Sequence, residues 1–322
     1  MAQSPLPHLL LVNLGTPEAA TPESVREFLE EFLGDPAVVD LPRWFWMPIL
    51  KGIVLRTRPK RVALQYAAIW SPEGSPLRAA TEFMVRALRE IGENNFTVSS
   101  AYRYGEPSLD TAMKRLARET SGPIIVVPLF PQRTDATTGT AFRAAHEAAA
   151  RAGIDDRVVE RLIAPDDPGY VEAMAAGFRS AAGRARIAPE HLVISYHGIP
   201  KRYDQREGHI YTSDCEATTK ALLAAIEWPA DSVTHAYQSK FGPEAWLTPA
   251  TADVLEKLPD QGVSSVVVIT PGFVTDGLET IEEIGIRGKE TFLEAGGIVL
   301  TRVTAVEDHP AFLRSLAALA RG

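Results

Sequence analysis

Three pairs of segments recur in the same order along the two halves of the chain, and this repeat limits the possible folds more than any single motif. Residues 8–17 (HLLLVNLGTP) match residues 191–200 (HLVISYHGIP) in their His-Leu start, apolar run, glycine and proline. A second pair joins residues 98–102 to 233–237, and a looser third pair joins 124–135 to 266–276. Short apolar runs of this kind are typical of buried strands. We therefore predict two related halves, each with its own sheet.

Helical patterns separate the predicted strands, which favours an α/β fold with doubly wound parallel sheets. We predict domains at residues 1–164 and 165–308, followed by a terminal helix over 309–322. In open α/β sheets, ligands bind outside the carboxyl ends of the strands. We therefore expect the two halves to face one crevice. The predicted helices cover residues 106–119, 135–151, 214–227, 249–258 and 277–295.

The first half carries an apolar insertion, residues 18–97, between its first two predicted strands. It contains Phe32, the aromatic run Trp44-Phe45-Trp46-Met47 and the basic residue Arg56. These side chains are ordinary core in one interpretation. In another they wall a cavity for a large, flat, apolar ligand whose carboxylates the basic side chains hold. The aromatic run is also a candidate lip for contact with lipid.

Two residues after predicted strands of the second half are candidates for chemistry. His197 follows the run Leu192-Val193-Ile194, and Glu279 follows the third strand of the same half. A histidine there can exchange a proton near neutral pH or ligate a metal ion. Each residue also has a purely structural interpretation. His197 would cap its strand, and Glu279 would place a favourable negative charge at the start of a helix. Together they suit proton abstraction or capture of a divalent metal, with Glu283 as a further candidate ligand at i+4.

Composition excludes several classes of protein. The net charge of −8 argues against nucleic acid as a partner. No apolar run is long enough to span a membrane, and the amino terminus lacks the pattern of a signal peptide. The single cysteine, Cys215, rules out an intrachain disulfide or a thiolate-held cluster within the chain. Motifs for nicotinamide, phosphoryl-transfer or serine-hydrolase chemistry are absent. We expect a cytoplasmic protein.

Several longer motifs, in order, resemble the ferrochelatase family, whose members insert ferrous iron into a porphyrin to form haem. The resemblance runs from about Leu9 to Val306 and implies two Rossmann-like domains that face each other across a porphyrin cleft. It also implies a lyase of haem biosynthesis that needs no bound cofactor. The motifs are residues 13–17 (NLGTP), 102–104 (YRY), 195–200 (SYHGIP), 238–247 (QSKFGPEAWL) and 271–283 (PGFVTDGLETIEE).

The resemblance assigns roles to particular residues. His197 is the catalytic histidine and Glu279 the carboxylate, and both are candidate metal ligands. A base must reach the ring centre because a free-base porphyrin loses two inner protons, and a rigid cleft can bend the ring. The residues that match or lie beside porphyrin-contacting positions are Leu14, Phe32, Arg56, Tyr66, Arg103, Tyr104 and Trp246.

Three positions depart from the family pattern. Asp135 stands where some members have a cluster-binding cysteine, so we expect no iron–sulfur cluster. Gly277 replaces a histidine or cysteine two residues before the carboxylate. Arg287 stands where relatives often carry a third acidic residue after Glu279 and Glu283. On one helical face it would either repel an incoming divalent ion or, in the alternative expected here, pair with Glu283 at i, i+4.

Two alternatives to an iron chelatase remain at this point. One is a tetrapyrrole-binding protein without turnover, and the other is a chelatase for another metal or tetrapyrrole. Retention of His197 and Glu279 favours catalysis. Protoporphyrin IX and coproporphyrin III both remain open as substrates, because sequence alone does not position their peripheral carboxylates. We expect a monomer, with loose contact to the inner face of a membrane as a further hypothesis.

Overall fold

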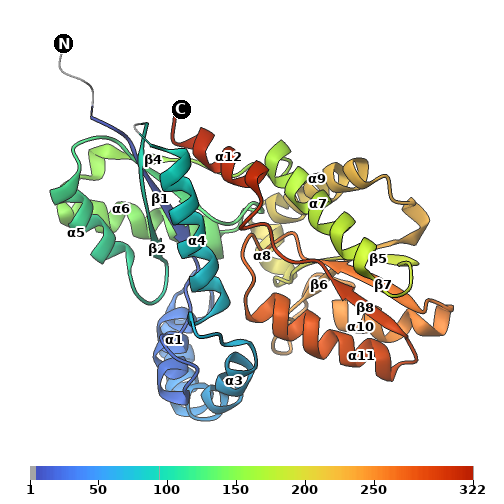
Figure 1. Ribbon diagram of the computed structural model, residues 1–322. Helices are drawn as coiled ribbons and strands as arrows, with labels where there is room; N and C mark the ends of the chain where they lie inside the picture. Colours follow the sequence, from blue (N-terminus) through green and yellow to red (C-terminus); the bar gives the residue numbers. More distant parts are fainter. Residues whose placement is uncertain (1–4, 94, 322) are drawn as a thin grey trace. The chain divides into compact units, whose positions relative to one another are not determined.

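The computed structural model describes residues 5–93 and 95–321, and the chain divides into two compact units (Figure 1). The first unit comprises residues 1–130, 135–163 and 316–322, and the second comprises residues 131–134 and 164–315. Each unit has its own parallel sheet and its own apolar core.

The first unit is built on a four-stranded parallel sheet with the strand order β2-β1-β3-β4. Strand β1 is buried along its whole length, as expected for a continuous apolar run with neighbours on both sides. In the β1–β2 pair Asn13 lies opposite Tyr102, so these strands end side by side. The strands are β1 (His8–Asn13), β2 (Thr97–Tyr102), β3 (Ile124–Pro128) and β4 (Val158–Glu160).

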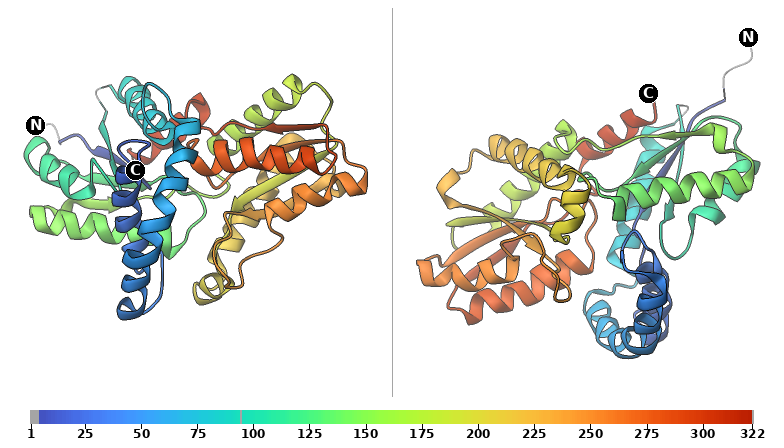
Figure 2. Two further views of the ribbon diagram at one scale, coloured as in Figure 1. Left: turned by 90° about the horizontal axis from the view of Figure 1, so that it is seen from below. Right: turned by 180° about the vertical axis from the view of Figure 1, so that it is seen from behind.

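Helices of the first unit pack on its sheet and also form the insertion between β1 and β2. Side chains of α5 and α6 pack against Leu10 and Val12 on one face of the sheet. In the insertion, α1 and α3 lie together beyond the sheet (Figures 1 and 2). The elements are α1 (Pro22–Gly34), α2 (Arg43–Ile49), the π-helix η1 (Leu50–Val54), α3 (Leu55–Ile69), α4 (Pro76–Ile91), α5 (Leu109–Glu119), the π-turn η2 (Asp135–Gly139), α6 (Thr140–Ala152) and the 3₁₀ turn η3 (Asp155–Arg157).

The second unit repeats this sheet with the strand order β6-β5-β7-β8, again all parallel. The central run Leu192-Val193-Ile194 is completely buried. His197, the last residue of β5, lies opposite Gln238, the last residue of β6. The strands are β5 (His191–His197), β6 (Val233–Gln238), β7 (Ser265–Ile269) and β8 (Val299–Arg302).

Helices cover both faces of the second sheet (Figure 2). Helices α7 and α9 pack together, whereas α10, α11 and η6 bury Leu255, Phe292 and Ile284 against the opposite face. Helix α12 spans the boundary between the units in sequence. The elements are α7 (Pro168–Arg184), α8 (Lys201–Arg206), α9 (Ile210–Ile226), the 3₁₀ turn η4 (Ala230–Ser232), α10 (Thr251–Lys257), the 3₁₀ turn η5 (Pro259–Gln261), the π-helix η6 (Leu278–Gly288), α11 (Lys289–Glu294) and α12 (Pro310–Leu319).

The predicted α/β class and the internal repeat are confirmed, because each sheet places its first strand second in the spatial order. Several details differ. The helix expected from residue 106 begins at Leu109, since the Ser108 hydroxyl accepts the amide of Thr111 and caps the helix there. The segment 277–295 is a π-helix followed by an α-helix. Helix α7 and strands β4 and β8 were not predicted.

Among the described residues, no helix is both long enough and apolar enough to cross a membrane.

Candidate active site

The imidazole of His197 lies at the carboxyl end of β5 with its tautomer fixed by the main chain. Its Nδ1 lies 2.7 Å from the carbonyl oxygen of Gly198. A carbonyl oxygen only accepts hydrogen bonds, so Nδ1 carries a proton and donates it. The neutral ring therefore keeps its lone pair on Nε2, the position that can take a proton or bind a metal ion. The Tyr211 hydroxyl donates to the carbonyl oxygen of His197 at 2.6 Å and fixes the backbone.

Glu279 lies in the first turn of η6, which follows the neighbouring strand β7. Burial raises the pKa of its carboxyl above the ordinary value, the nearby His197 lowers it, and Glu283 raises it further. His197 and Glu279 lie near each other because they come at or beyond the carboxyl ends of adjacent strands of one parallel sheet. The structure thus brings together the two residues to which sequence reasoning assigned the chemistry.

The carboxylate of Glu283 holds the loop that follows β6. Ser239 donates its main-chain amide at 2.7 Å and its hydroxyl at 2.6 Å to the two carboxylate oxygens. Ser239 has a positive φ of 64°, which turns the chain sharply after the strand. Glu283 therefore anchors this turn, and its part in metal binding stays a prediction.

The expected pairing of Arg287 with Glu283 is wrong. Arg287 instead pairs with Glu282, with its Nε donating at 2.8 and 3.0 Å and its Nη2 at 2.9 Å. The cause is the helix type, because a π-helix brings residues at i and i+5 together where an α-helix would bring i and i+4. The positive charge of Arg287 is thus paired with Glu282, which is not one of the two glutamates proposed to bind the metal ion.

Trp246 packs against the glycine that follows His197. A Cβ atom at Gly198 would lie 3.2 Å from the indole ring and 2.7 Å from the main-chain oxygen of Gln238. The close approach therefore requires glycine at this position. The indole nitrogen is buried and has no hydrogen-bond partner within the part of the chain that the structure describes.

In the first unit, four predicted porphyrin-contacting residues gather at the carboxyl ends of β1 and β2. The amide of Tyr104 donates to the carbonyl of Leu14 at 2.9 Å, and the rings of Phe32 and Tyr104 lie 5.1 Å apart. The Arg103 guanidinium lies 4.5 Å above the Tyr104 ring. A Cβ atom at Gly15 would lie 1.8 Å from the Tyr104 carbonyl oxygen, and its φ is 111°, so only glycine fits between the strands.

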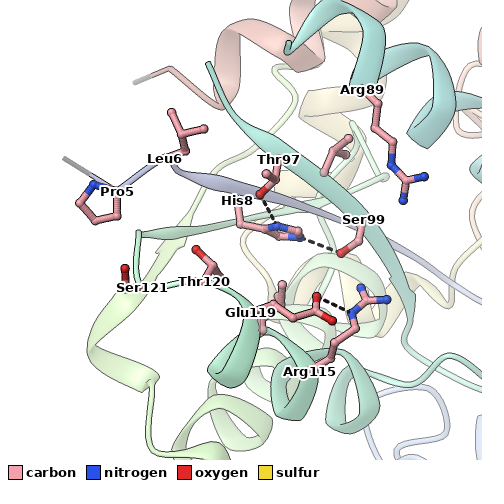
Figure 3. Close-up of a pocket in the computed structure, with 12 residues that line it drawn as sticks. Pro5, Leu6, His8, Arg89, Thr97, Ser99, Arg115, Glu119, Thr120 and Ser121 are labelled. Carbon is pink, nitrogen blue, oxygen red and sulfur yellow. Dashed lines mark hydrogen bonds and ion pairs between the residues drawn. The ribbon is translucent and has the colours of Figure 1, made fainter. Parts of the chain in front are cut away.

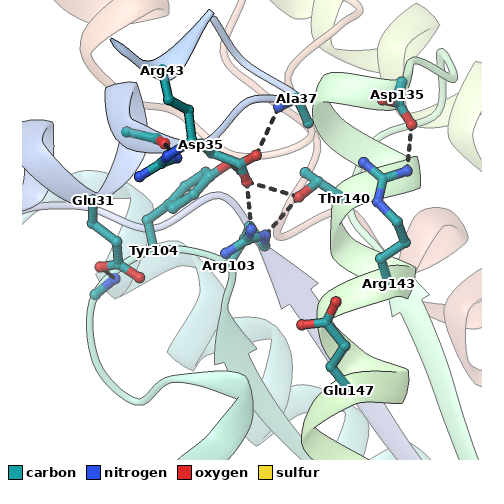
Figure 4. A network of polar contacts seen from close by, with 12 residues as sticks. Glu31, Asp35, Ala37, Arg43, Arg103, Tyr104, Asp135, Thr140, Arg143 and Glu147 are labelled. Atoms are coloured by element: carbon teal, nitrogen blue, oxygen red, sulfur yellow. Dashed lines mark hydrogen bonds and ion pairs between the residues drawn. The ribbon is translucent and has the colours of Figure 1, made fainter. Parts of the chain in front are cut away.

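Asp35, which sequence reasoning missed, lies at the centre of this group (Figure 4). One carboxylate oxygen accepts hydrogen bonds from Tyr104 and Thr140, each at 2.9 Å, and from Arg103, while the other accepts the amide of Ala37 at 2.8 Å. Burial alone would raise the pKa of Asp35, but these donors bring it below the ordinary value. Asp35 joins the end of α1 to β2 and α6. Sequence separations of 68 to 105 residues left no local signal for it.

The two other predicted porphyrin-contacting residues of this unit lie on α3. Arg56 is exposed. Tyr66 is buried and meets Trp70 edge to face, with 6.0 Å between ring centroids. Contact of either residue with a ligand stays a prediction.

A cavity of about 520 Å³ lies elsewhere in the first unit, at the amino ends of β1 and β2 (Figure 3). His8 faces it and bonds Thr97 and Ser99, each at 2.7 Å. Burial, and then the charges of Arg115, Arg89 and Arg157, lower the pKa of His8 to about 4. The cavity therefore lies at the end of the sheet opposite Leu14 and Arg103.

Within residues 5–93 and 95–321, no three His, Cys, Asp or Glu side chains form a group suited to holding a metal ion. Cys215 is buried, and burial raises the pKa of its thiol.

Two parallel sheets of one strand order, the second with a histidine and a partly buried glutamate at neighbouring strand ends, define a two-sheet α/β protein. Two solved structures share this fold at low sequence identity, which shows the fold alone. SirB from Bacillus subtilis with Fe3+ has a TM-score of 0.56 at 13% identity, covering 98% of this chain and 94% of SirB. A multi-domain protein from Deinococcus radiodurans, described as similar to chelatases, has a TM-score of 0.54 at 15% identity, covering 98% and 55%.

Sequence comparisons identify the family. The ferrochelatase family model matches residues 8–322. A ferrochelatase of Vibrio atlanticus is 41% identical, covering 97% of this chain and 96% of the relative. A ferrochelatase of Chromobacterium violaceum is 38% identical, covering 99% and 88%. The chain therefore belongs to the ferrochelatase family, metal-chelating lyases that form haem by inserting iron into a porphyrin.

Proposed function

We propose that this chain inserts ferrous iron into a free-base porphyrin with His197 as the proton acceptor and Glu279 as the carboxylate for metal delivery or proton exit. The observation that carries this assignment is the basic Nε2 of His197, set by the Nδ1 hydrogen bond, near a partly buried carboxyl. A base with a fixed tautomer can receive a proton without first reorienting.

The reaction needs both a base and a place for a divalent ion. Two inner N–H protons leave the porphyrin while Fe²⁺ takes their place, so two protons are released for each iron inserted. The porphyrin nitrogens must displace the ligands of the ion, and an imidazole and a carboxylate bind Fe²⁺ and can also exchange protons. Ionised Glu279 would offset the positive charge of the ion or of protonated His197.

The proposal assigns porphyrin binding to the cluster at the end of the first sheet. Leu14 and Phe32 offer apolar contact, and Arg103 and Tyr104 are held rigid by Asp35. Arg56 and Tyr66 of α3 and Trp246 of the second unit complete the proposed set. Rigid side chains lose little entropy when a flat ligand binds.

The porphyrin is protoporphyrin IX or coproporphyrin III, which differ in their peripheral carboxylates. The test follows the fluorescence of each free-base porphyrin during anaerobic addition of Fe²⁺ to the enzyme. Loss of fluorescence with one porphyrin identifies the substrate. Binding of both without metal-dependent loss would overturn the proposal and leave a tetrapyrrole-binding protein, and loss only with another divalent ion would indicate a different chelatase.

We also propose that the enzyme is a cytoplasmic monomer without a resident cofactor that touches a membrane through Trp44 and Phe45. Trp44 is 80% exposed and Phe45 is 48% exposed. Trp46 does not belong to this lip, because it is 9% exposed and its indole donates to the Leu33 carbonyl at 2.7 Å. Two exposed aromatic rings suit the membrane interface. Replacing both with serine should reduce co-sedimentation with anionic vesicles, and unchanged sedimentation would contradict the lip.

A further inference from the structure

Gln238 is a buried polar residue whose side chain bonds both the strand of His197 and the backbone of Glu279. It ends β6, lies opposite His197 in the sheet and is 2% exposed. A buried carboxamide must have its hydrogen bonds satisfied, because an unmet donor or acceptor costs about 1–3 kcal/mol. The partners of Gln238 therefore show what its position requires.

Each of these partners lies beside His197 or belongs to Glu279. The side-chain oxygen accepts the hydroxyl of Ser195 at 2.8 Å, and the side-chain nitrogen donates to the main-chain oxygen of Glu279 at 2.8 Å. The main-chain oxygen of Gln238 accepts the amide of Gly198 at 2.8 Å. One residue thus joins β5, on both sides of His197, to the first turn of η6.

We propose that Gln238 is a positioning residue that holds the Glu279 carboxyl beside His197. The Gln238 carboxamide fixes the Glu279 backbone at the first turn of η6, and this sets where the Glu279 side chain begins. The carboxamide is neutral, so it fixes the distance without adding a charge that would compete with His197 or an arriving metal ion.

Ser239, the residue after Gln238, bonds η6 at a second point. Ser239 holds the Glu283 carboxylate through its amide and hydroxyl, four residues beyond Glu279. Gln238, the last residue of β6, and Ser239, the first residue after it, therefore fix η6 at both Glu279 and Glu283. This arrangement resists sliding of the helix along its axis, which a single hydrogen bond would not prevent.

The inference rests on the proposed roles of His197 and Glu279, and its test uses the intact enzyme with three variants. Gln238→Met keeps the side-chain length and removes both hydrogen bonds. Gln238→Glu keeps the acceptor for Ser195 but replaces the donor to Glu279. Thr251→Val is the matched control, because Thr251 makes the other side-chain contact of the Ser195 hydroxyl, at 2.7 Å. Circular dichroism and porphyrin binding establish folding of each.

We expect both Gln238 variants to lower kcat for iron insertion by ~10–100-fold, as a misplacement of about 1 Å can do, with porphyrin Kd changed less than ~2-fold. Thr251→Val should keep kcat within ~3-fold, because loss of one neutral hydrogen bond there leaves the Glu279 contact intact. A fall in porphyrin binding that accounts for the whole loss in the Gln238 variants would overturn the inference.

A double-mutant cycle with Glu279→Gln separates positioning from general loss of structure. If Gln238 acts through the Glu279 carboxylate, Gln238→Met should lower kcat by less than ~3-fold in the Glu279→Gln background. Additive losses would overturn the positioning role while leaving the proposed function in place. Wild-type insertion by Glu279→Gln alone would instead remove Glu279 from the proposed function, and the inference would fail with it.

Discussion

The two sheets share a strand order, yet the carboxylates at their carboxyl edges lie in opposite environments. Asp35 in the first unit has donors on both oxygens, which bring its pKa below the ordinary value. Glu279 in the second unit has a pKa raised by burial. At the matched positions of the repeat, the first unit has Leu14 and the second has His197. The comparison indicates one scaffold used twice, with the proposed porphyrin-binding residues in the first unit and the proposed catalytic pair in the second.

The largest expected effect comes from removing the base in the second unit. His197→Ala should lower iron insertion by ~10²–10⁴-fold, because a positioned general base contributes about that much. Porphyrin binding, measured by fluorescence titration, should stay close to wild type. Near-wild-type turnover would remove His197 from the mechanism.

The two glutamates of η6 should differ in severity. Glu279→Gln should lower insertion by ~10²-fold, at the lower end of the general acid–base range. Glu283→Gln should cost only a few-fold, mostly at low metal concentration, because its carboxylate already holds Ser239. The rate against Fe²⁺ concentration for both variants checks this order, and a reversed order would show that Glu283 is the main metal ligand.

A third carboxyl, that of Glu307, should make the stability of the fold depend on pH. Its Oε2 is buried and has no hydrogen-bond partner among the described residues. Burial, with nearby Asp276, raises its pKa from 4.5 to about 7. The unfolded chain therefore loses this proton first as pH rises. The free energy of unfolding that depends on this proton is at its full value below pH 4.5. It falls by about 3 kcal/mol as the pH rises from 4.5 through about 7, at 1.36 kcal/mol per pKa unit.

Urea unfolding of Glu307→Gln tests this sign. The variant should be more stable than wild type at pH 8 by up to about 3 kcal/mol and should match it near pH 4.5. Glu190→Gln is the control with the opposite sign, because the Ser264 amide and hydroxyl lower the pKa of Glu190. A wild-type curve that is flat between these pH values would contradict the account of Glu307.

A smaller effect is expected from removing the Asp35 carboxylate that holds Arg103 and Tyr104 in the first unit. Asp35→Asn removes the charge that holds Arg103 and Tyr104 and should weaken porphyrin binding ~10-fold, or about 1.4 kcal/mol. The control is Asp135→Asn, which breaks an exposed pair with Arg143 and should cost under about 1 kcal/mol of stability. Equal porphyrin affinity in both variants would show that Asp35 only stabilises the fold.

The fold could be predicted from the sequence because the apolar runs, their repeat and the helical spacing between them are local signals. The same signals place His197 and Glu279 after neighbouring strands. Asp35 was missed because its partners are distant in sequence. Gln238 begins the motif 238–247, but its position depends on a hydrogen bond to the Glu279 backbone, which no sequence pattern reveals.

Helix type and packing explain one error in side-chain placement and settle one alternative that the sequence left open. Arg287 pairs with Glu282 because η6 is a π-helix, whereas the spacing argument assumed an α-helix. Trp46 is buried because its indole finds the Leu33 carbonyl, while its neighbour Trp44 points to solvent. Hydrophobic character alone does not distinguish adjacent aromatic residues on opposite sides of a short helix.

The division between a binding unit and a reactive unit is tested most directly by single-turnover insertion at saturating porphyrin. Wild type, Leu14→Ala and His197→Ala are mixed with the identified porphyrin and then with Fe²⁺, and the loss of free-base fluorescence is timed. Saturation removes differences in affinity, so Leu14→Ala should regain a rate within ~3-fold of wild type, as expected for lost uniform binding. His197→Ala should remain ~10²–10⁴-fold slower. Recovery of His197→Ala at saturation, or a persistent loss of that size in Leu14→Ala, would contradict the account.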